Sequence, residues 1–281
     1  MIRKRVSTKE NYSALHVGGK TIRIALDNNK PITELEYPEF YDVKITGYCT
    51  GGCPWCYQNS TPRDLHYKDI VGKCERFFGT MTENQKPFQI ALGGGNPNQH
   101  PDFTTLLKYL RSIDITPNYT SNGIGLTEEI LEATKKYCGG VAISCHPHLQ
   151  PIWREAIEKL LSWEIKTNLH IIVSDKNSID YLQNIFDQYK DKVDYFVLLP
   201  YTAQGRATEK GIDYEELTNF LKRNDSKKIA FGANFYEYLK ENKDVAPVSL
   251  YEPEIMSKYL DLSDMKMYKS SFSSTPIKIC L

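Results

Sequence analysis

From residue 41 onward, short apolar runs alternate with stretches whose apolar residues recur at helical spacing. After the second run, for example, Phe103, Leu106, Leu107 and Leu110 follow the i, i+3, i+4, i+7 pattern of one helix face. Six runs are rich in branched or aromatic residues and are bounded by turn-forming residues, as strands are: 41–46, 88–92, 115–120, 141–145, 169–173 and 195–199. The pattern predicts six strand–helix units in succession.

The predicted helices begin at residues that suit a helix start. Thr127 and Ser178 can cap a first turn, Asp213 opens a capping-box-like sequence, and Pro151 fits a first turn. The first helix is predicted to begin at Thr61-Pro62. Strands joined through helices form a parallel sheet with right-handed crossovers, and a closed barrel of this kind has eight units. The sequence therefore predicts an α/β fold, a partial (βα)6 barrel of the TIM type with an open parallel sheet.

The flanks of this core predict smaller units. Residues 1–38 hold two strand-like runs around Gly18-Gly19, the pattern of a small β hairpin. The barrel core is predicted at 39–224, and residues 225–281 form a C-terminal extension. Within the extension, 229–231 predicts one more strand and 235–239 a short helix.

Composition narrows the class of protein. The 281 residues are 41% hydrophobic and 25% charged, as in ordinary globular proteins. Lys plus Arg equals Asp plus Glu at 35 each, so no global charge attracts nucleic acid or an anionic membrane. The sequence has neither a signal-peptide apolar segment nor a run long enough to cross a bilayer. We therefore expect a cytoplasmic protein whose thiols stay reduced.

Three cysteines form the most informative motif. Cys49, Cys53 and Cys56 are spaced C-x3-C-x2-C in the loop after the first predicted strand. Three thiolates cannot complete a tetrahedral sulfur site around one metal, but they can hold three irons of a [4Fe–4S] cluster and leave the fourth iron open. A zinc site with a fourth ligand elsewhere is the alternative. No second C-x2-C pair is visible, and His146 and His148 are only two residues apart.

Two further loops follow predicted strands. Gly94-Gly95-Asn96-Pro97 comes after the second strand and Ser121-Asn122-Gly123 after the third. Ligands of parallel α/β folds bind at the carboxyl ends of the strands. We therefore expect both loops to share a site with the cysteine loop, although each sequence also fits a simple turn.

The C-x3-C-x2-C spacing with an aromatic residue, Trp55, before the third cysteine resembles the signature of radical S-adenosylmethionine (SAM) enzymes. The resemblance extends over roughly residues 40–206 and includes the Gly-Gly-Glu-Pro motif of that family, with Asn96 where many members have Glu. It implies that Cys49, Cys53 and Cys56 ligate the catalytic cluster. The residues that it places against SAM are Trp55, Gly94, Gly95, Asn96, Ser121, Asn122, Ser144 and Arg206.

Several residues also have plainer interpretations. Ser144 fits an ordinary strand position, and Arg206 fits a solvated surface charge. Cys74, Cys138 and Cys145 fit buried structural thiols. Many peptide-modifying relatives carry a cysteine-rich C-terminal extension, of which this chain has only Cys280.

The resemblance also implies the chemistry. Radical SAM enzymes cleave SAM reductively at the cluster to a 5′-deoxyadenosyl radical, which abstracts hydrogen from a substrate. The electron comes from a reductant such as flavodoxin or ferredoxin. Because the core and hairpin resemble peptide maturases of this family, a peptide or protein is the first expectation for the substrate. A small molecule or nucleoside is the second, and a non-catalytic iron–sulfur or zinc-binding protein is the alternative of another class.

Overall fold

The computed structural model describes residues 2–208, 211–243, 245 and 252–279. Two sheets occur in these ranges. The smaller is antiparallel, in the order β1 (Ile2–Ser7), β2 (Tyr12–Val17) and β3 (Lys20–Ala25). The predicted hairpin is confirmed as β2 and β3, and β1 adds a strand that the sequence did not predict.

The larger sheet has ten strands in the described part of the chain. Every neighbouring pair from β10 to β11 is parallel, while β12 and β13 continue antiparallel beyond β11. In spatial order the strands are β10 (Ile229–Phe231), β9 (Tyr195–Pro200), β8 (Thr167–Val173), β7 (Val141–Ser144), β6 (Thr116–Ser121), β5 (Gln89–Gly94), β4 (Phe40–Thr46), β11 (Ser257–Asp261), β12 (Lys266–Tyr268) and β13 (Lys278–Ile279).

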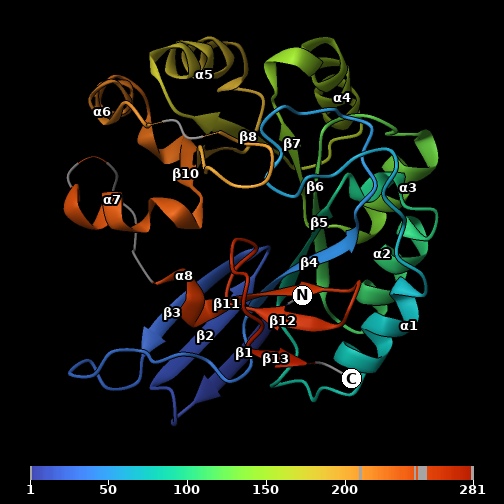
Figure 1. Ribbon diagram of the computed structural model, residues 1–281. Coiled ribbons are helices and arrows are strands. Elements are labelled where there is room, and N and C mark those ends of the chain that lie inside the picture. Colours follow the sequence, from blue (N-terminus) through green and yellow to red (C-terminus); the bar gives the residue numbers. More distant parts are fainter. Residues whose placement is uncertain (1, 209–210, 244, 246–251, 280–281) are drawn as a thin grey trace.

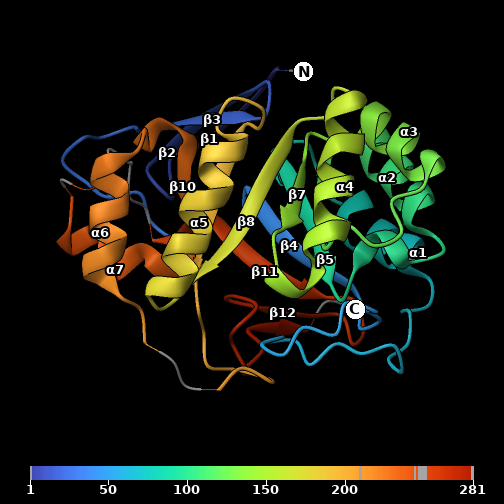
Figure 2. The same cartoon turned by 90° about the horizontal axis from the view of Figure 1, so that it is seen from above.

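This sheet confirms the predicted α/β fold with a partial barrel. The six predicted strands are β4 to β9, with ends shifted by one or two residues, and β10 matches the predicted strand at 229–231. Figures 1 and 2 show α2 to α6 following one another around the outer face of the sheet. The C-terminal strand β11 pairs with β4 and so extends the sheet beside the strand that leads into the cysteine loop.

The helices in the described ranges are mostly those that the sequence predicts. No helix there is both long and apolar enough to cross a membrane. They are α1 (Ile70–Cys74), α2 (Phe103–Ser112), α3 (Glu128–Tyr137), α4 (Gln150–Ser162), α5 (Lys176–Tyr189), α6 (Tyr214–Arg223), α7 (Tyr236–Glu241) and α8 (Pro253–Met256).

Two of the predicted helix caps are confirmed and one is wrong. Thr127 and Asp213 accept hydrogen bonds from the backbone N–H groups of Ile130 and Glu216. For α5 the cap is Asp175, whose carboxylate accepts from the N–H of Ser178 at 3.1 Å. Ser178 therefore lies inside the first turn instead of before it.

The predicted helix start at Thr61-Pro62 is also wrong, because α1 begins at Ile70. Thr61 is held in a turn instead, since its N–H and hydroxyl both donate to Asp64, at 2.6 and 2.8 Å. Isolated bridges pair Thr61 with Tyr48 and His66 with Thr46. The stretch therefore packs against the cysteine loop, and these long-range contacts override the helix-start signal.

The alternation of side chains along β4 separates core from pocket. Tyr41, Val43 and Ile45 are buried in the main hydrophobic cluster beneath the helices. Phe40 and Asp42 line a pocket on the opposite, inner face. The barrel thus has an apolar outer face that fixes the helices and an inner face free to carry polar groups.

Candidate functional site

A cavity of about 640 Å³ lies at the carboxyl ends of the barrel strands. It brings together ten of the eleven residues that the sequence predicts for the site. They are Cys49, Cys53, Trp55, Cys56, Gly94, Gly95, Asn96, Ser121, Asn122 and Ser144. Because four successive strands, β4 to β7, contribute these residues, the parallel sheet itself gathers them.

Arg206, the eleventh residue, braces the cysteine loop from outside the cavity lining. Its guanidinium donates to the carbonyl oxygen of Cys53 twice, at 3.1 Å each, and to that of Ser60 at 3.0 Å. Its backbone N–H donates to the carbonyl of Cys56 at 3.1 Å. Arg206 therefore fixes the backbone that carries two of the three cysteines.

Gly205 allows this contact. It adopts a φ of +66°, and a Cβ there would lie 2.5 Å from the carbonyl oxygens of both Cys56 and Tyr57. Only glycine combines that backbone conformation with so close an approach. The turn after β9 is thus shaped to press against the cysteine loop.

The glycine run after β5 presses on the same loop from another side. The N–H groups of Gly95 and Asn96 donate to the carbonyls of Thr46 and Tyr48, at 2.8 and 2.9 Å. A Cβ at Gly95 would lie 2.0 Å from the Tyr48 oxygen. The absence of a side chain at residue 95 therefore serves the packing of two loops against each other.

The Asn96 side chain joins the loop after β5 to the turn after β6. It is 1% exposed, accepts from the N–H of Asn122 at 3.2 Å and donates to the carbonyl of Ile124 at 2.9 Å. A glutamate could accept but could not donate in this way. Asn at residue 96 is accordingly matched to the turn beside it.

Asn122 also contacts a cysteine sulfur. Its Oδ1 accepts from the N–H of Ile124 at 3.0 Å, which turns its Nδ2 toward Cys49 Sγ, 3.5 Å away. The N–H of Gly51 donates to the same sulfur at 3.3 Å. Cys49 Sγ is thus the acceptor of two N–H groups.

The thiols themselves are partly buried. Burial raises the pKa of Cys49, and burial together with the neighbouring thiols raises the pKa of Cys53 to about 12. The nearby Arg206 charge opposes both shifts. Binding of these sulfurs to iron would therefore release protons.

Trp55 and two histidines form an aromatic group beside the cysteines. The Trp55 ring meets His146 and His148 edge-on, at centroid distances of 5.7 and 5.3 Å, and His148 Nε2 lies 3.1 Å from the carbonyl of Gly51. Burial lowers the pKa of His146 to about 4, which keeps it neutral. Both histidine rings therefore pack against Trp55 beside the cysteine loop, and His146 does so as a neutral group.

The C-terminal segment supplies the far wall of the cavity, which the sequence did not predict. Gln58 Nε2 donates to the hydroxyl of Tyr259 at 3.2 Å, and the Tyr57 and Phe272 rings lie 4.8 Å apart. Asp42, also on the inner face, was likewise missed. The sequence pattern that could have revealed Asp42 is the alternation of polar and apolar residues along β4. This alternation places Asp42 on the face opposite the buried Tyr41 and Val43.

The remaining cysteines lie apart from this cavity. Cys74 and Cys145 are buried, as expected of structural thiols, and Cys138 is half-buried after α3. Cys280 lies outside the described residues. Across the described ranges, no three His, Cys, Asp or Glu side chains converge closely enough to hold one metal ion.

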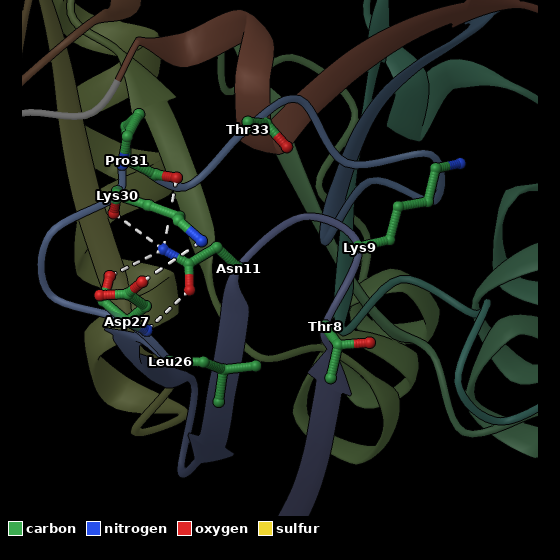
Figure 3. A pocket seen from close by; sticks show the side chains of 8 residues that line it. All are labelled: Thr8, Lys9, Asn11, Leu26, Asp27, Lys30, Pro31 and Thr33. Atoms are coloured by element: carbon green, nitrogen blue, oxygen red, sulfur yellow. Dashed lines mark hydrogen bonds and ion pairs between the residues drawn. The ribbon is translucent and has the colours of Figure 1, made fainter.

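A second cavity, of about 520 Å³, lies at the loops of the small sheet (Figure 3). Asn11 stands at its centre and donates to the carbonyls of Asp27 and Lys30, at 2.9 and 2.8 Å. Its Oδ1 accepts from the N–H of Asp27 at 2.7 Å. These polar groups satisfy one another, and none of the predicted site residues lines this cavity.

Comparison with known proteins identifies the part of the chain that holds the cysteines. Residues 43–148 match the family model of the radical SAM superfamily. This segment is a radical SAM domain. The superfamily uses a [4Fe–4S] cluster and SAM, so the cofactor expectation drawn from the cysteine spacing agrees with the match.

Relatives of the radical SAM domain include mycofactocin maturase MftC of Mycobacterium tuberculosis, 28% identical over 102 residues. That match covers 34% of this chain and 24% of MftC, so the chain spans about a quarter of the length of the curated relatives it matches.

The fold is shared more widely. Streptococcus suis SuiB bound to S-adenosylmethionine superimposes with a TM-score of 0.71 over 96% of this chain and 81% of SuiB, at 13% identity. For anSMEcpe with bound AdoMet and a peptide the TM-score is 0.61, over 85% of this chain and 76% of that one, at 13% identity.

Proposed function

We propose that this chain is a radical SAM enzyme that modifies a peptide or protein. The observation that carries the proposal is a single cavity lined at once by three free thiols, the glycine run after β5 and the Ser-Asn-Gly turn after β6. No one of these features is specific alone. Their convergence at successive strand ends is what SAM binding beside a cluster requires.

The residues present fit the expected cofactors. Three thiols, with no fourth among the described residues that line the cavity, suit a cluster that keeps one iron for another ligand. Trp55 Nε1 is buried and has no hydrogen-bond partner among the described residues. Since buried N–H groups are rarely left unpaired, this atom supports a bound ligand with an acceptor at this wall of the cavity.

When bound, the cluster and SAM supply a 5′-deoxyadenosyl radical able to take a hydrogen atom from a substrate. The chain itself would hold these cofactors and shield them from water. Cys49, Cys53 and Cys56 would ligate iron, while Arg206 fixes their backbone from outside. Gly94, Gly95, Ser121 and Ser144 would face SAM, and the C-terminal segment limits access of water.

Anaerobic reconstitution with iron and sulfide tests the enzymatic proposal. We expect a [4Fe–4S] spectrum and, with SAM and dithionite, formation of 5′-deoxyadenosine measured by chromatography. An intact cluster without 5′-deoxyadenosine would refute the proposal and favour a non-catalytic iron–sulfur protein. Zinc bound in place of iron would favour a zinc-binding protein.

Cysteine variants test the ligand assignment. Cys53→Ala should lose the cluster and the cleavage of SAM together. Cys138→Ala is the matched control, since Cys138 is a half-buried thiol outside the cavity lining. Retention of the cluster in Cys53→Ala, or its loss in Cys138→Ala, would overturn the assignment.

A peptide substrate is supported by the proteins that share the fold or part of the sequence. One structure shows SuiB bound to its precursor peptide SuiA, another shows anSMEcpe with a peptide, and MftC is named a maturase. Co-expression with any short open reading frame beside the gene should change the mass of the encoded peptide. A flavodoxin or ferredoxin is the proposed electron donor, and the free thiols suit a reducing, cytoplasmic location.

A further inference from the structure

One carboxylate on the inner face of the barrel has no partner in the part of the chain that the structure describes. Asp42 lies on β4, between β5 and β11, and lines the main cavity. Within the described ranges no hydrogen bond or ion pair involves its side chain. The side chain is exposed, and the space to which it is exposed is the cavity, because the strand is flanked on both sides.

The other charged groups that line the cavity are compensated. Lys258 Nζ lies 2.9 Å from Glu34, and Lys269 Nζ lies 3.2 Å from Glu254. Burial lowers the pKa of both His146 and His170 to about 4, so both are neutral near pH 7. Among the described lining residues, the charge of Asp42 is therefore the one left unbalanced.

An unbalanced carboxylate inside a barrel carries a free-energy cost. Burial raises the pKa of Asp42 to about 6, and no cation among the described residues counters the shift. A group that supplies positive charge or N–H donors would remove this cost. The residue is thus disposed toward a ligand that the chain itself does not provide.

The walls beside Asp42 indicate the kind of ligand. Phe40 lines the cavity two residues before Asp42 on the same strand, and Tyr259 is the ladder partner of Asp42 on β11. Aromatic walls next to a carboxylate suit a long aliphatic stem that ends in a cation, which packs its methylenes on the rings. An acidic or wholly apolar side chain would gain nothing from this carboxylate.

We infer that Asp42 binds the cationic end of the substrate, a lysine or arginine side chain of a peptide. This inference rests on the proposed function, because it assigns specificity within the same cavity. Asp42 would set which residue of the peptide enters beside SAM, and the aromatic walls would hold its stem.

Binding to the reconstituted protein with SAM tests the inference. The probes are two short blocked glycine peptides, one with a central lysine and one with norleucine, followed by ligand-observed NMR. Wild type should bind the lysine peptide roughly tenfold more tightly, the value of a hydrogen bond to a charged group. Asp42→Asn should lose that preference. Equal binding of both peptides by wild type would overturn the inference without any variant.

A matched control separates this effect from general charge. Asp261→Asn removes a carboxylate on β11 that is paired with Lys44 at 3.4 Å and lies outside the cavity lining. It should keep the lysine preference, and loss of the preference in both variants would overturn the inference. Formation of 5′-deoxyadenosine by wild type is measured in parallel. If wild type forms no 5′-deoxyadenosine, the proposed function is rejected. If wild type forms it but shows no preference for the lysine peptide, only the role of Asp42 is rejected.

Discussion

At the scale of single residues, the contact between Asn122 and Cys49 has a measurable consequence. N–H groups that point at a ligating sulfur stabilise the reduced, more negative cluster and raise its potential. Asn122→Asp keeps the shape of the side chain and its bond to Ile124 but replaces the Nδ2 donor by a carboxylate oxygen, which also adds a negative charge beside Cys49. We expect the cluster potential, measured by a redox titration followed by EPR, to fall by at least about 20–40 mV. The lost bond, worth about 0.5–1 kcal/mol, accounts for that much, and the added charge acts in the same direction.

Asn98→Asp is the control for that shift. Asn98 also donates to the carbonyl of Ile124, at 2.8 Å, but no contact joins its side chain to a described cysteine sulfur. Its variant adds the same charge without removing a donor to a cysteine sulfur, so it should shift the potential less than Asn122→Asp. An equal shift in both variants would show that the turn, and not the N–H group at the sulfur, sets the potential.

Asp42 makes a second residue-scale prediction, on stability. The pKa of Asp42 is about 6 in the folded protein, above the ordinary 3.8. The stability of the protein is therefore fully present below pH 4, where Asp42 is protonated, and part of it is lost as the pH rises through 6 and the carboxyl ionises. Tyr57 and Tyr259, which face it, stay neutral because burial raises the pKa of both. Asp42→Asn should therefore be more stable than wild type at pH 7.5 and equal to it at pH 4.

The gain should be about 1 kcal/mol, less than the full pKa shift implies, because solvent in the cavity screens the charge. Urea unfolding of the cluster-free protein at both pH values measures it. A variant that is less stable than wild type at pH 7.5 would contradict the assigned burial cost.

At the scale of elements, the cysteine loop depends on the turn after β9. Arg206→Ala removes three hydrogen bonds, two to the carbonyl of Cys53 and one to that of Ser60. Hydrogen bonds from a charged group are worth about 1.5–3 kcal/mol each, so the loop should loosen and iron should be lost to a chelator roughly tenfold faster. Arg223→Ala, which removes an exposed pair with Glu216, should leave the rate unchanged. Unchanged iron loss in Arg206→Ala would refute the bracing role.

The elements also show what sequence reasoning can reach. Strands β4 to β9 were predictable because each is a short apolar run between helices, so the local pattern carries the fold. The C-terminal strand β11 was not, because its place beside β4 depends on a pairing of segments far apart in the chain.

The same division applies to the candidate site. Residues at the ends of successive strands, such as Cys49, Gly95 and Asn122, could be brought together from the parallel topology alone. Asp42 and Tyr259 could not, because the wall that they form exists only once β4 and β11 have paired. The bracing role of Arg206 also needed the structure, since a turn sequence does not reveal which loop it touches.

At the scale of the whole molecule, the small sheet is fastened to the barrel through Glu39. This carboxylate is 2% exposed and accepts from Arg23 at 2.6 Å and from the hydroxyl of Tyr12. Arg5, from the same sheet, donates to the carbonyl of Tyr37 at 2.6 Å. The junction thus combines a buried, charged network with a small apolar cluster in which Tyr12 and Ala14 pack with Phe88.

Glu39→Ala should destabilise the protein by about 3 kcal/mol, because it removes one partner of a buried ion pair. Glu36→Ala, which breaks an exposed pair with Lys9, should leave the free energy of unfolding essentially unchanged. Urea unfolding compares the two, and limited proteolysis shows whether the small sheet separates first. Equal effects of both substitutions would mean that the junction lies elsewhere.

The pairing of β11 with β4 bears on the stage of synthesis at which the protein can take up its cluster. The two strands are separated by roughly two hundred residues, and contacts over such separations form late in folding. During synthesis the cysteine loop emerges early, while the wall that shelters it arrives near the end of the described chain. Cluster assembly on a nascent chain would therefore meet three open thiols without their cover. We expect iron to be taken up efficiently only after translation of the C-terminal strands is complete.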